Sequence, residues 1–427
     1  MLNKTILVTG CAGFIGSNFV PYFLNKYENY NIVNLDLLTY AGNLENLKEV
    51  EDHPRYKFIK GDICNRELIE FIFNEYDIQG VIHFAAESHV DNSIKNPGIF
   101  VETNVNGTFT LLDVAYKHWM EKPFAYKETF RHCEEQSDVA IQKTSRHSRE
   151  GGNPAFQHPI SEASLPRFHH ISTDEVYGTL SDDPNDLFTE KTPYAPNSPY
   201  SASKASSDMI VRSYVETYGM NCVITNCSNN YGPKQHDEKL IPTIIRKALA
   251  GEAIPIYGDG KNIRDWLYVL DHCKGIDLVY HTGRSGETYN IGGRNERTNL
   301  QIVDCICTIL DEKVPLSCHC EKQSDAAIQK TSRHSVLDTE STSVIASHRH
   351  SVLDTESTSV IANEVKQSIT SYKDLITFVQ DRAGHDRRYA IDATKIENEL
   401  GWKAEETFDT GIVKTIEWYL NKYGINK

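Results

Sequence analysis

The strand–turn–helix pattern at the amino terminus constrains the fold of this chain more than any other segment. A short apolar run at residues 4–9 leads into a turn that holds Gly10, Gly13 and Gly16, and an apolar-periodic segment then extends to about Lys26. This order predicts a buried strand, a tight turn and a helix. Glycines at these positions let the backbone turn sharply and approach a pyrophosphate, which binds at the amino terminus of the helix.

A second strand, expected at residues 31–35, ends at Asp36. An acidic residue about 20 positions beyond the last glycine binds the ribose 2′-hydroxyl of a dinucleotide. A carboxylate here favours NAD over NADP, because it repels the extra phosphate of NADP. A glycine-rich turn alone also fits an ordinary strand–helix connection, but strand, turn, helix, strand and acid in this order indicate a dinucleotide-binding unit.

Two groups of reactive side chains follow in the middle of the chain. The first is Thr173, Asp174 and Glu175, and the second is Tyr200 and Lys204, which are four residues apart. Tyrosine and lysine at this spacing share one face of a helix, so the ammonium is expected to lower the pKa of the phenol and make it a base. The acidic pair adds a second acid and a second base. Each group alone also fits a polar loop or an exposed helical pair, but after a dinucleotide pattern they predict redox and elimination chemistry in one pocket.

Strand and helix patterns alternate through the first half of the chain. Further parallel strands are expected at residues 56–60, 81–84, 168–172 and 222–227, and helices at residues 65–76, 99–117 and 199–218. Repeated βα units predict an α/β fold, a Rossmann doubly wound parallel sheet with helices on both faces. Beyond about Asn230, helices expected at 240–250, 271–282, 299–310 and 408–422 predict a smaller, mainly helical substrate-binding domain, with some segments returning to the sheet.

Composition excludes several classes of protein. The net charge of −15 argues against a nucleic-acid partner. No stretch is long and apolar enough to span a membrane, and the first residues run into a strand, so we expect a cytoplasmic protein. The ten cysteines are scattered as in reduced proteins, and Cys318 and Cys320 have Cys-x-Cys spacing, so no metal site is predicted.

Many further motifs occur in the order typical of one known family. They lie at residues 36–43, 61–63, 84–91, 103–108, 229–233, 263–266 and 381–386. With these motifs the chain resembles the extended short-chain dehydrogenase/reductase family, and within it the nucleotide-sugar 4,6-dehydratases. The run from Thr173 to Glu175 separates these dehydratases from related epimerases. Leu270 and Ala383 depart from the family pattern, which usually has an acid and a proline there.

The resemblance implies NAD as the cofactor and dTDP-glucose as the substrate. The residues implied to bind the cofactor are Gly10, Gly13, Phe14, Ile15, Gly16, Asp36, Leu37, Thr39, Asp62, Ile63, Phe84, Ala85, Ala86, Ser88, Thr103, Tyr200, Lys204 and Asn230. Those implied to bind the nucleotide-sugar are Ser88, Thr173, Asn229, Lys239, Leu240, Pro255, Ile256, Tyr257, Arg264, Asn295, Asp381, Arg382, His385 and Asp386. It also implies a homodimer, in which helices 99–117 and 199–218 form a four-helix bundle across a two-fold axis.

The resemblance assigns a role to each catalytic residue as well. Tyr200 removes the proton of the sugar 4-hydroxyl while hydride leaves C4 for NAD, and Lys204 holds the tyrosinate and the nicotinamide ribose. Thr173 orients the reacting hydroxyl. Glu175 then removes the C5 proton, Asp174 protonates the departing 6-hydroxyl, and hydride returns to C6. The product is a 4-keto-6-deoxy sugar, and the cofactor is regenerated.

An internal repeat interrupts the family pattern twice. Residues 134–148 recur almost unchanged at 321–335, and residues 333–346 recur at 349–362. These polar runs lack helical or strand periodicity, and we interpret them as in-frame insertions that form surface loops, although a new recognition surface also fits their composition. The expected organisation is a Rossmann domain at 1–126 and 166–229, a nucleotide-sugar-binding domain at 230–317 and 370–427, and inserts at 127–165 and 318–369.

Three alternatives remain open on the sequence alone. A nucleotide-sugar 4-epimerase uses the tyrosine–lysine pair but has no need for Asp174 or Glu175. A dehydratase for another nucleotide-sugar, such as GDP-mannose, shares the elimination chemistry. A non-catalytic dinucleotide-binding protein has no need for either group of reactive side chains.

Overall fold

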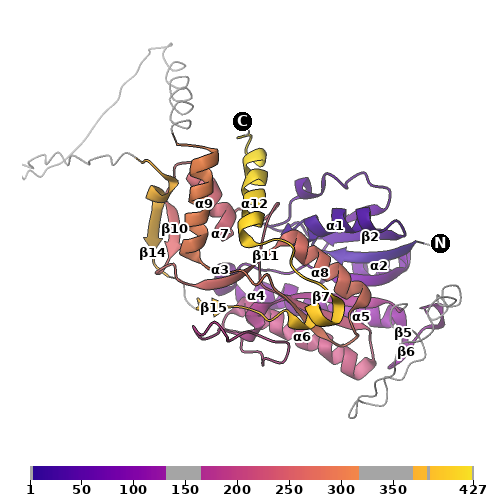
Figure 1. The fold of residues 1–427 in the computed structure, drawn as a ribbon. Coiled ribbons are helices and arrows are strands. Elements are labelled where there is room, and N and C mark those ends of the chain that lie inside the picture. The colour runs from indigo at the N-terminus through magenta and orange to yellow at the C-terminus, as the bar shows by residue number, and fades with distance from the viewer. Residues whose placement is uncertain (1–2, 131–164, 317–368, 382–384, 426–427) are drawn as a thin grey trace, which may run out of the picture.

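The computed structural model describes residues 3–130, 165–316, 369–381 and 385–425. A parallel sheet in the order β12-β8-β7-β4-β1-β2-β3 lies at its centre (Figure 1). Its strands are β1 (Lys4–Thr9), β2 (Tyr30–Asp36), β3 (Tyr56–Lys60), β4 (Ile78–His83), β7 (Arg167–Thr173), β8 (Cys222–Cys227) and β12 (Thr288–Ile291). The strand order reverses at β1, which has β2 on one side and β4 on the other. This doubly wound α/β arrangement confirms the predicted fold class.

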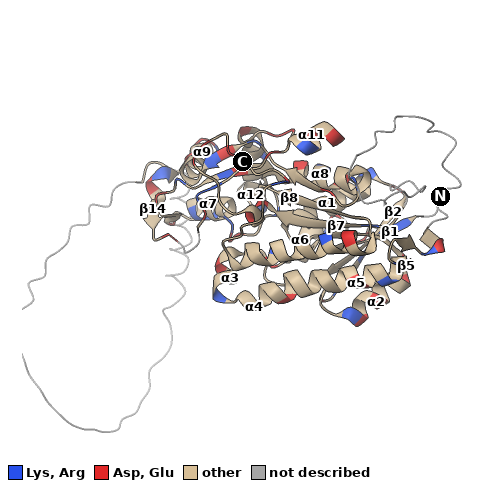
Figure 2. Cartoon of the chain, turned by 90° about the horizontal axis from the view of Figure 1, so that it is seen from below, with Lys and Arg blue, Asp and Glu red and all other residues tan. Residues whose placement is uncertain are grey.

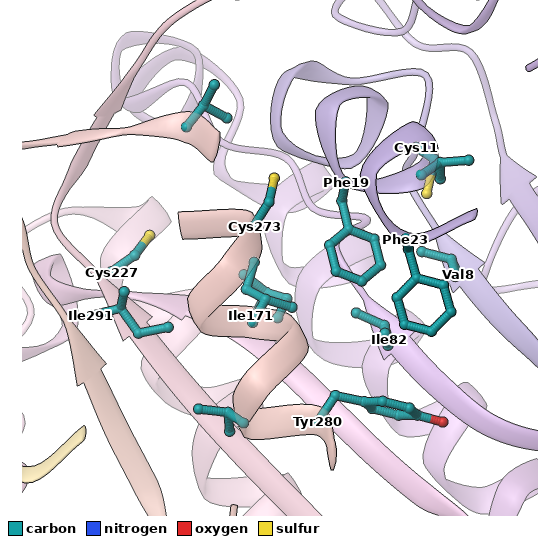
Figure 3. Close-up of a cluster of buried hydrophobic side chains, with 14 of the residues drawn as sticks. Val8, Cys11, Phe19, Phe23, Ile82, Ile171, Cys227, Cys273, Tyr280 and Ile291 are labelled. Atoms are coloured by element: carbon teal, nitrogen blue, oxygen red, sulfur yellow. The ribbon is translucent and has the colours of Figure 1, made fainter. Parts of the chain in front are cut away.

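Helices cover both faces of the sheet because successive side chains of each strand point to opposite faces. Ile6 and Val8 pack under α1 (Phe14–Lys26) and α8 (Val269–Thr282), where Figure 3 shows Phe19 and Tyr280 beside the sheet. Leu7 faces the opposite cluster, under α2 (Arg66–Tyr76), α5 (Thr108–Trp119) and α6 (Pro199–Tyr218). Both faces of β1 are therefore buried, as a central parallel strand requires.

A second lobe is built around its own apolar cluster. It contains α7 (Leu240–Leu249), α9 (Asn299–Lys313) and α12 (Phe408–Lys422), with α11 (Thr394–Leu400) next to the main sheet. Its short strands are β9 (Asn229–Tyr231), β10 (Ile254–Tyr257), β11 (Ile263–Tyr268), β13 (Glu296–Thr298), β14 (Ile376–Val379) and β15 (Arg388–Tyr389). The lobe is thus helical with small sheets, while β12 and α8 return to the main sheet as expected. No helix in the described ranges is long and apolar enough to cross a membrane.

The single helix expected at residues 99–117 has three parts. After α3 (Val90–Lys95) the chain forms α4 (Pro97–Phe100), a π-helical stretch at Val101–Gly107, and then α5. The wide turns bring the buried Asn104 side chain to the backbone of Glu87, with contacts of 2.8 and 3.0 Å, and to Ser203 Oγ of α6 at 2.8 Å. The π-helical stretch therefore ties the loop after β4 to α6.

Residues 131–164 and 317–368, which make up most of the two predicted inserts, lie outside the described residues, as do Cys318 and Cys320. A short hairpin of β5 (Met120–Lys122) and β6 (Ala125–Tyr126) precedes the first insert, and the first described residues of the insert form a 3-10 turn at Glu128–Phe130. Phe130 is buried in the same apolar cluster that Leu165 contacts. On either side of the second insert, the Asp311 carboxylate accepts hydrogen bonds from Ser371 Oγ (2.5 Å) and Tyr372 N (3.0 Å). The chain thus leaves and rejoins the fold at the same place in both cases.

We expect a variant in which short Gly/Ser linkers replace residues 131–164 and 317–368 to fold with little change in thermal unfolding midpoint, because loop closure costs only about 0.6 kcal/mol per doubling of loop length. Removing the buried ring by Phe130→Ala in the full chain should instead cost about 3 kcal/mol in the free energy of unfolding. Calorimetry compares the two variants. An insoluble deletion variant would assign the inserts a structural role.

Candidate active site

One cavity of ≈ 380 Å³ opens at the carboxyl ends of the central strands. This edge of a doubly wound sheet, next to the reversal of strand order, is where such folds bind ligands. The cavity is lined by all eighteen residues predicted to bind a dinucleotide and by all five predicted catalytic residues. Residues far apart in the sequence therefore meet in a single site.

The glycine-rich turn forms the floor of this cavity. Gly10 has a φ of +77°, and a Cβ atom there would lie 2.6 Å from the Ala85 backbone nitrogen. A Cβ on Gly16 would lie 2.6 Å from the Cα of Cys11. No side chain caps the amino terminus of α1, so its backbone N–H groups remain available to phosphate oxygens. The turn fits a pyrophosphate.

Asp36 occupies the end of β2 beside the turn. Its Oδ2 accepts a hydrogen bond from Ala12 N and its Oδ1 one from Leu38 N, both at 2.8 Å. Burial raises the pKa of this carboxyl, and the two backbone donors oppose the rise. The backbone thus fixes an acidic group where a ribose hydroxyl binds, and the residues present fit NAD.

The acidic run begins where β7 ends. Thr173 Oγ1 accepts a hydrogen bond from Glu175 N at 3.3 Å and lies 3.4 Å from Asp174 Oδ1, which starts a 3-10 turn at Asp174–Tyr177. Burial, followed by the charges of Glu175 and Asp265, raises the pKa of Asp174 well above its ordinary value. The direction of this shift favours the protonated carboxyl, which suits a proton donor.

Tyr200 and Lys204 lie one turn apart in the first half of α6, and both line the cavity. Burial, followed by the charge of Glu175, raises the pKa of Tyr200 well above its ordinary value. The expected lowering of this pKa is therefore wrong for the protein alone, because desolvation of the phenolate and the charge of Glu175 both raise it.

A segment of the lobe, residues 233–239, contributes to the lining of the cavity, and the sequence interpretation predicted only Lys239 of it as a binding residue. Lys234 Nζ lies 2.5 Å from Glu49 Oε1 and donates to Ser17 O at 3.1 Å. Lys239 Nζ donates to Ser88 O at 3.2 Å. The segment adds Gln235, His236 and Glu238 to the lining. It has no periodic pattern, so only these long-range contacts identify it.

The predicted nucleotide-sugar residues fall into two groups. Ser88, Thr173, Asn229 and Lys239 line the cavity, and Leu240 begins α7 beside it. The remaining described ones lie in the lobe, outside the lining of the cavity; they are Pro255, Ile256, Tyr257, Arg264, Asn295, Asp381, His385 and Asp386. Arg382 lies outside the described residues.

Three side chains of the lobe group have other contacts. Ile256 is 1% exposed within the lobe core, so only its backbone is available to a ligand. The Asn295 amide donates to Gly293 O at 2.7 Å and accepts from Phe408 N at 3.2 Å. The Arg264 guanidinium stacks on the Tyr389 ring, 4.3 Å from its centroid, and donates to Asp386 O at 2.8 Å.

The fold and site define a dinucleotide-dependent enzyme of the short-chain dehydrogenase/reductase type. Residues 6–292 match the sequence profile of the NAD dependent epimerase/dehydratase family, and the chain belongs to this family. Residues 312–415 match the profile of GDP-mannose 4,6 dehydratase.

The individual relatives are more specific. The chain is 44% identical over 418 residues to dTDP-glucose 4,6-dehydratase of Neisseria gonorrhoeae, covering 98% of this chain and 96% of that protein. The crystal structure of dTDP-glucose 4,6-dehydratase from Bacillus anthracis in complex with NAD is 39% identical, with a TM-score of 0.69 and coverage of 99% and 98%. The enzyme of the same name from Streptomyces venezuelae, solved with NAD bound, is 35% identical, with a TM-score of 0.71 and coverage of 99% and 98%.

Asp36→Asn should weaken NAD binding by about tenfold or more, because a hydrogen bond to a charged group contributes ~1.5–3 kcal/mol. Binding of NADP should change little or improve, since the repelling charge is removed. Asp62→Asn is the matched control, because it removes another carboxylate of the cavity and should affect both dinucleotides alike. Calorimetry measures the affinities. Equal affinity of the unaltered protein for NAD and NADP would refute this role of Asp36.

Proposed function

We propose that this protein is a dTDP-glucose 4,6-dehydratase, which converts dTDP-glucose to dTDP-4-keto-6-deoxy-glucose and water. The observation that carries the proposal is the meeting of Thr173, Asp174, Glu175, Tyr200 and Lys204 in one cavity with the dinucleotide residues. An epimerase has no use for a protonated Asp174 beside Glu175. The names of the relatives support the same substrate.

Bound NAD supplies a reversible hydride acceptor, which takes a hydride from C4 and returns it at C6. The protein supplies the proton transfers. Tyr200 removes the proton of the 4-hydroxyl, with Lys204 as the cation beside it, and Thr173 orients that hydroxyl. The resulting 4-ketone acidifies the C5 proton, which Glu175 removes.

Asp174 gives its proton to the 6-hydroxyl as the C6–O bond breaks, and water leaves. The raised pKa of Asp174 keeps that proton in place until elimination. The hydride then adds to C6, and a proton returns to C5. Substrate and product differ by one water, with no net oxidation.

Incubation with dTDP-glucose, without added reductant, should give a product lighter by one water, measured by mass spectrometry. Glu175→Gln should oxidise the substrate, seen as NADH absorbance in a single turnover, but stall before water is lost. Tyr200→Phe should show no such absorbance and about 10²–10⁴-fold lower turnover, the scale of removing a general base.

Two outcomes contradict the assignment. If bound NAD is confirmed and the mass of the substrate does not change, the protein is not a dehydratase. A product that is an isomer of the substrate would identify an epimerase instead. Normal exchange of the C5 proton with solvent in the Glu175→Gln variant would move the second base elsewhere.

We also propose that the protein is a homodimer formed through α5 and α6. These helices contact each other along one side of the molecule (Figure 2). Phe109 of α5 is 44% exposed, Met209 of α6 is 59% exposed, and the neighbouring Ile99 and Val101 are exposed as well. A second copy related by a two-fold axis would cover these apolar side chains in a four-helix bundle.

Light scattering at micromolar concentration should give twice the chain mass for the unaltered protein. The double variant Phe109→Glu/Met209→Glu should be monomeric, because it places two carboxylates in the apolar contact. Phe378→Glu, at a ring on β14 that is 59% exposed, should remain dimeric. A monomer mass for the unaltered protein would exclude the dimer.

A further inference from the structure

The ammonium of Lys204 is held from behind by a buried polar cluster. Lys204 Nζ donates to Ile171 O at 2.8 Å and lies 3.3 Å from His170 Nε2. The same His170 nitrogen lies 3.2 Å from Asp208 Oδ1. Lys204, His170 and Asp208 are all buried, and Asp208 is one helical turn beyond Lys204 in α6. The cluster therefore places a carboxylate directly behind the active-site lysine.

Asp208 is fixed by two hydroxyl groups. Its Oδ2 accepts hydrogen bonds from Ser172 Oγ at 2.8 Å and from Tyr194 OH at 2.9 Å. Its Oδ1 has no hydrogen-bond partner within the described part of the chain and points at the His170 nitrogen. One oxygen thus anchors the carboxylate, and the other directs its charge toward Lys204.

The charges around Lys204 make this carboxylate necessary. His83 on β4 and His170 on β7 have pKa values lowered by burial, so both rings are neutral. Burial raises the pKa of Cys227 on β8, so this thiol is protonated, and Tyr194 is protonated for the same reason. Burial lowers the pKa of Lys204 to about 8, and the charge of Asp208 opposes that fall.

We propose that Asp208 is a positioning residue for the oxidation step: it is the buried counter-ion that keeps Lys204 protonated, so that an ammonium is present in the cavity with Tyr200. This role rests on the proposed function, because it concerns the cation that supports Tyr200. A lysine that is neutral near pH 8 no longer stabilises a tyrosinate. Removing the negative charge of Asp208 lowers the pKa of Lys204 further, so the charged form is lost at a lower pH.

The test compares Asp208→Asn with Asp277→Asn in the full chain. Asp277 is a matched control, because it is also a buried aspartate beside a lysine and a histidine, with Oδ2 2.6 Å from Lys26 Nζ and Oδ1 3.0 Å from His281 Nδ1. In single-turnover NADH formation, the alkaline limb of the pH profile should move to lower pH in Asp208→Asn only. If the alkaline limb moves down by one pH unit, the rate measured at a pH above the limb falls by about tenfold.

A second readout does not depend on turnover. NMR of protein labelled with ¹³C-lysine, with the Lys204 signal assigned through Lys204→Met, should show the lysine titrating at lower pH in Asp208→Asn than in the unaltered protein. Tyr194→Phe keeps the carboxylate but removes a hydrogen bond that lowers its pKa, so it should move the Lys204 titration in the same direction. This variant decides the question if Asp208→Asn does not fold.

The outcomes separate the two proposals. An unchanged Lys204 titration in both variants overturns the role of Asp208, while product formation by the unaltered enzyme leaves the dehydratase function standing. If the pKa of Lys204 falls in the variants but the unaltered protein releases no water from dTDP-glucose, the counter-ion role of Asp208 is supported and the dehydratase function is refuted. If the alkaline limb moves equally in Asp277→Asn, the shift reflects general destabilisation of the protein, and the proposal is overturned.

Discussion

The whole site depends on the parallel register of the central strands. Because β1, β2, β4, β7 and β8 run in one direction, their carboxyl ends meet at one edge of the sheet. The glycine turn follows β1, Asp36 ends β2, the acidic run follows β7, and Asn229 and Asn230 follow β8. A one-residue slip in any strand would turn its buried side chains to the wrong face, so the packing that fixes the sheet also fixes the chemistry.

At this edge of the sheet, burial favours different protonation states for neighbouring side chains. Desolvation and nearby carboxylates raise the pKa of Asp174, which favours its neutral acid form. Lys204 has the opposite need, since it must stay charged although desolvation lowers its pKa to about 8. A low-dielectric site can hold a proton donor and a cation together only if each has its own partner. Glu175 meets the first of these needs and Asp208 the second.

Local patterns in the sequence predicted the elements that depend on local chemistry. The strands at residues 4–9, 56–60 and 222–227 and the helices at 199–218 and 408–422 have the bounds expected for them. Binary patterning and the Ser198 cap before Pro199 define such elements without help from the rest of the chain. The glycine turn and Asp36 were predictable for the same reason, because a glycine turn and an acid at a strand end are local signals, whereas the other dinucleotide residues were expected only from the family resemblance.

Features that depend on long-range contacts were not predictable in this way. The π-helical stretch at 101–107 follows from the bonds of Asn104 to Glu87 and Ser203, which no periodicity reveals. The contacts of His170 with Lys204 and Asp208 likewise join β7 to α6. The side chain of Ile256 points into the lobe core because β10 pairs with β14, a strand that lies beyond the second insert.

The segment from Pro233 to Lys239 explains how the two lobes can serve one reaction cycle. A cofactor that is reduced and then reoxidised on the same substrate gains nothing from leaving between the two steps. The contacts of Lys234 with Glu49 and of Lys239 with Ser88 join this segment to the part of the chain that carries the main sheet. Gln235, His236 and Glu238 of the same segment line the cavity that also holds Asp174 and Lys204. The segment therefore links the second lobe to the site in which the proton transfers take place.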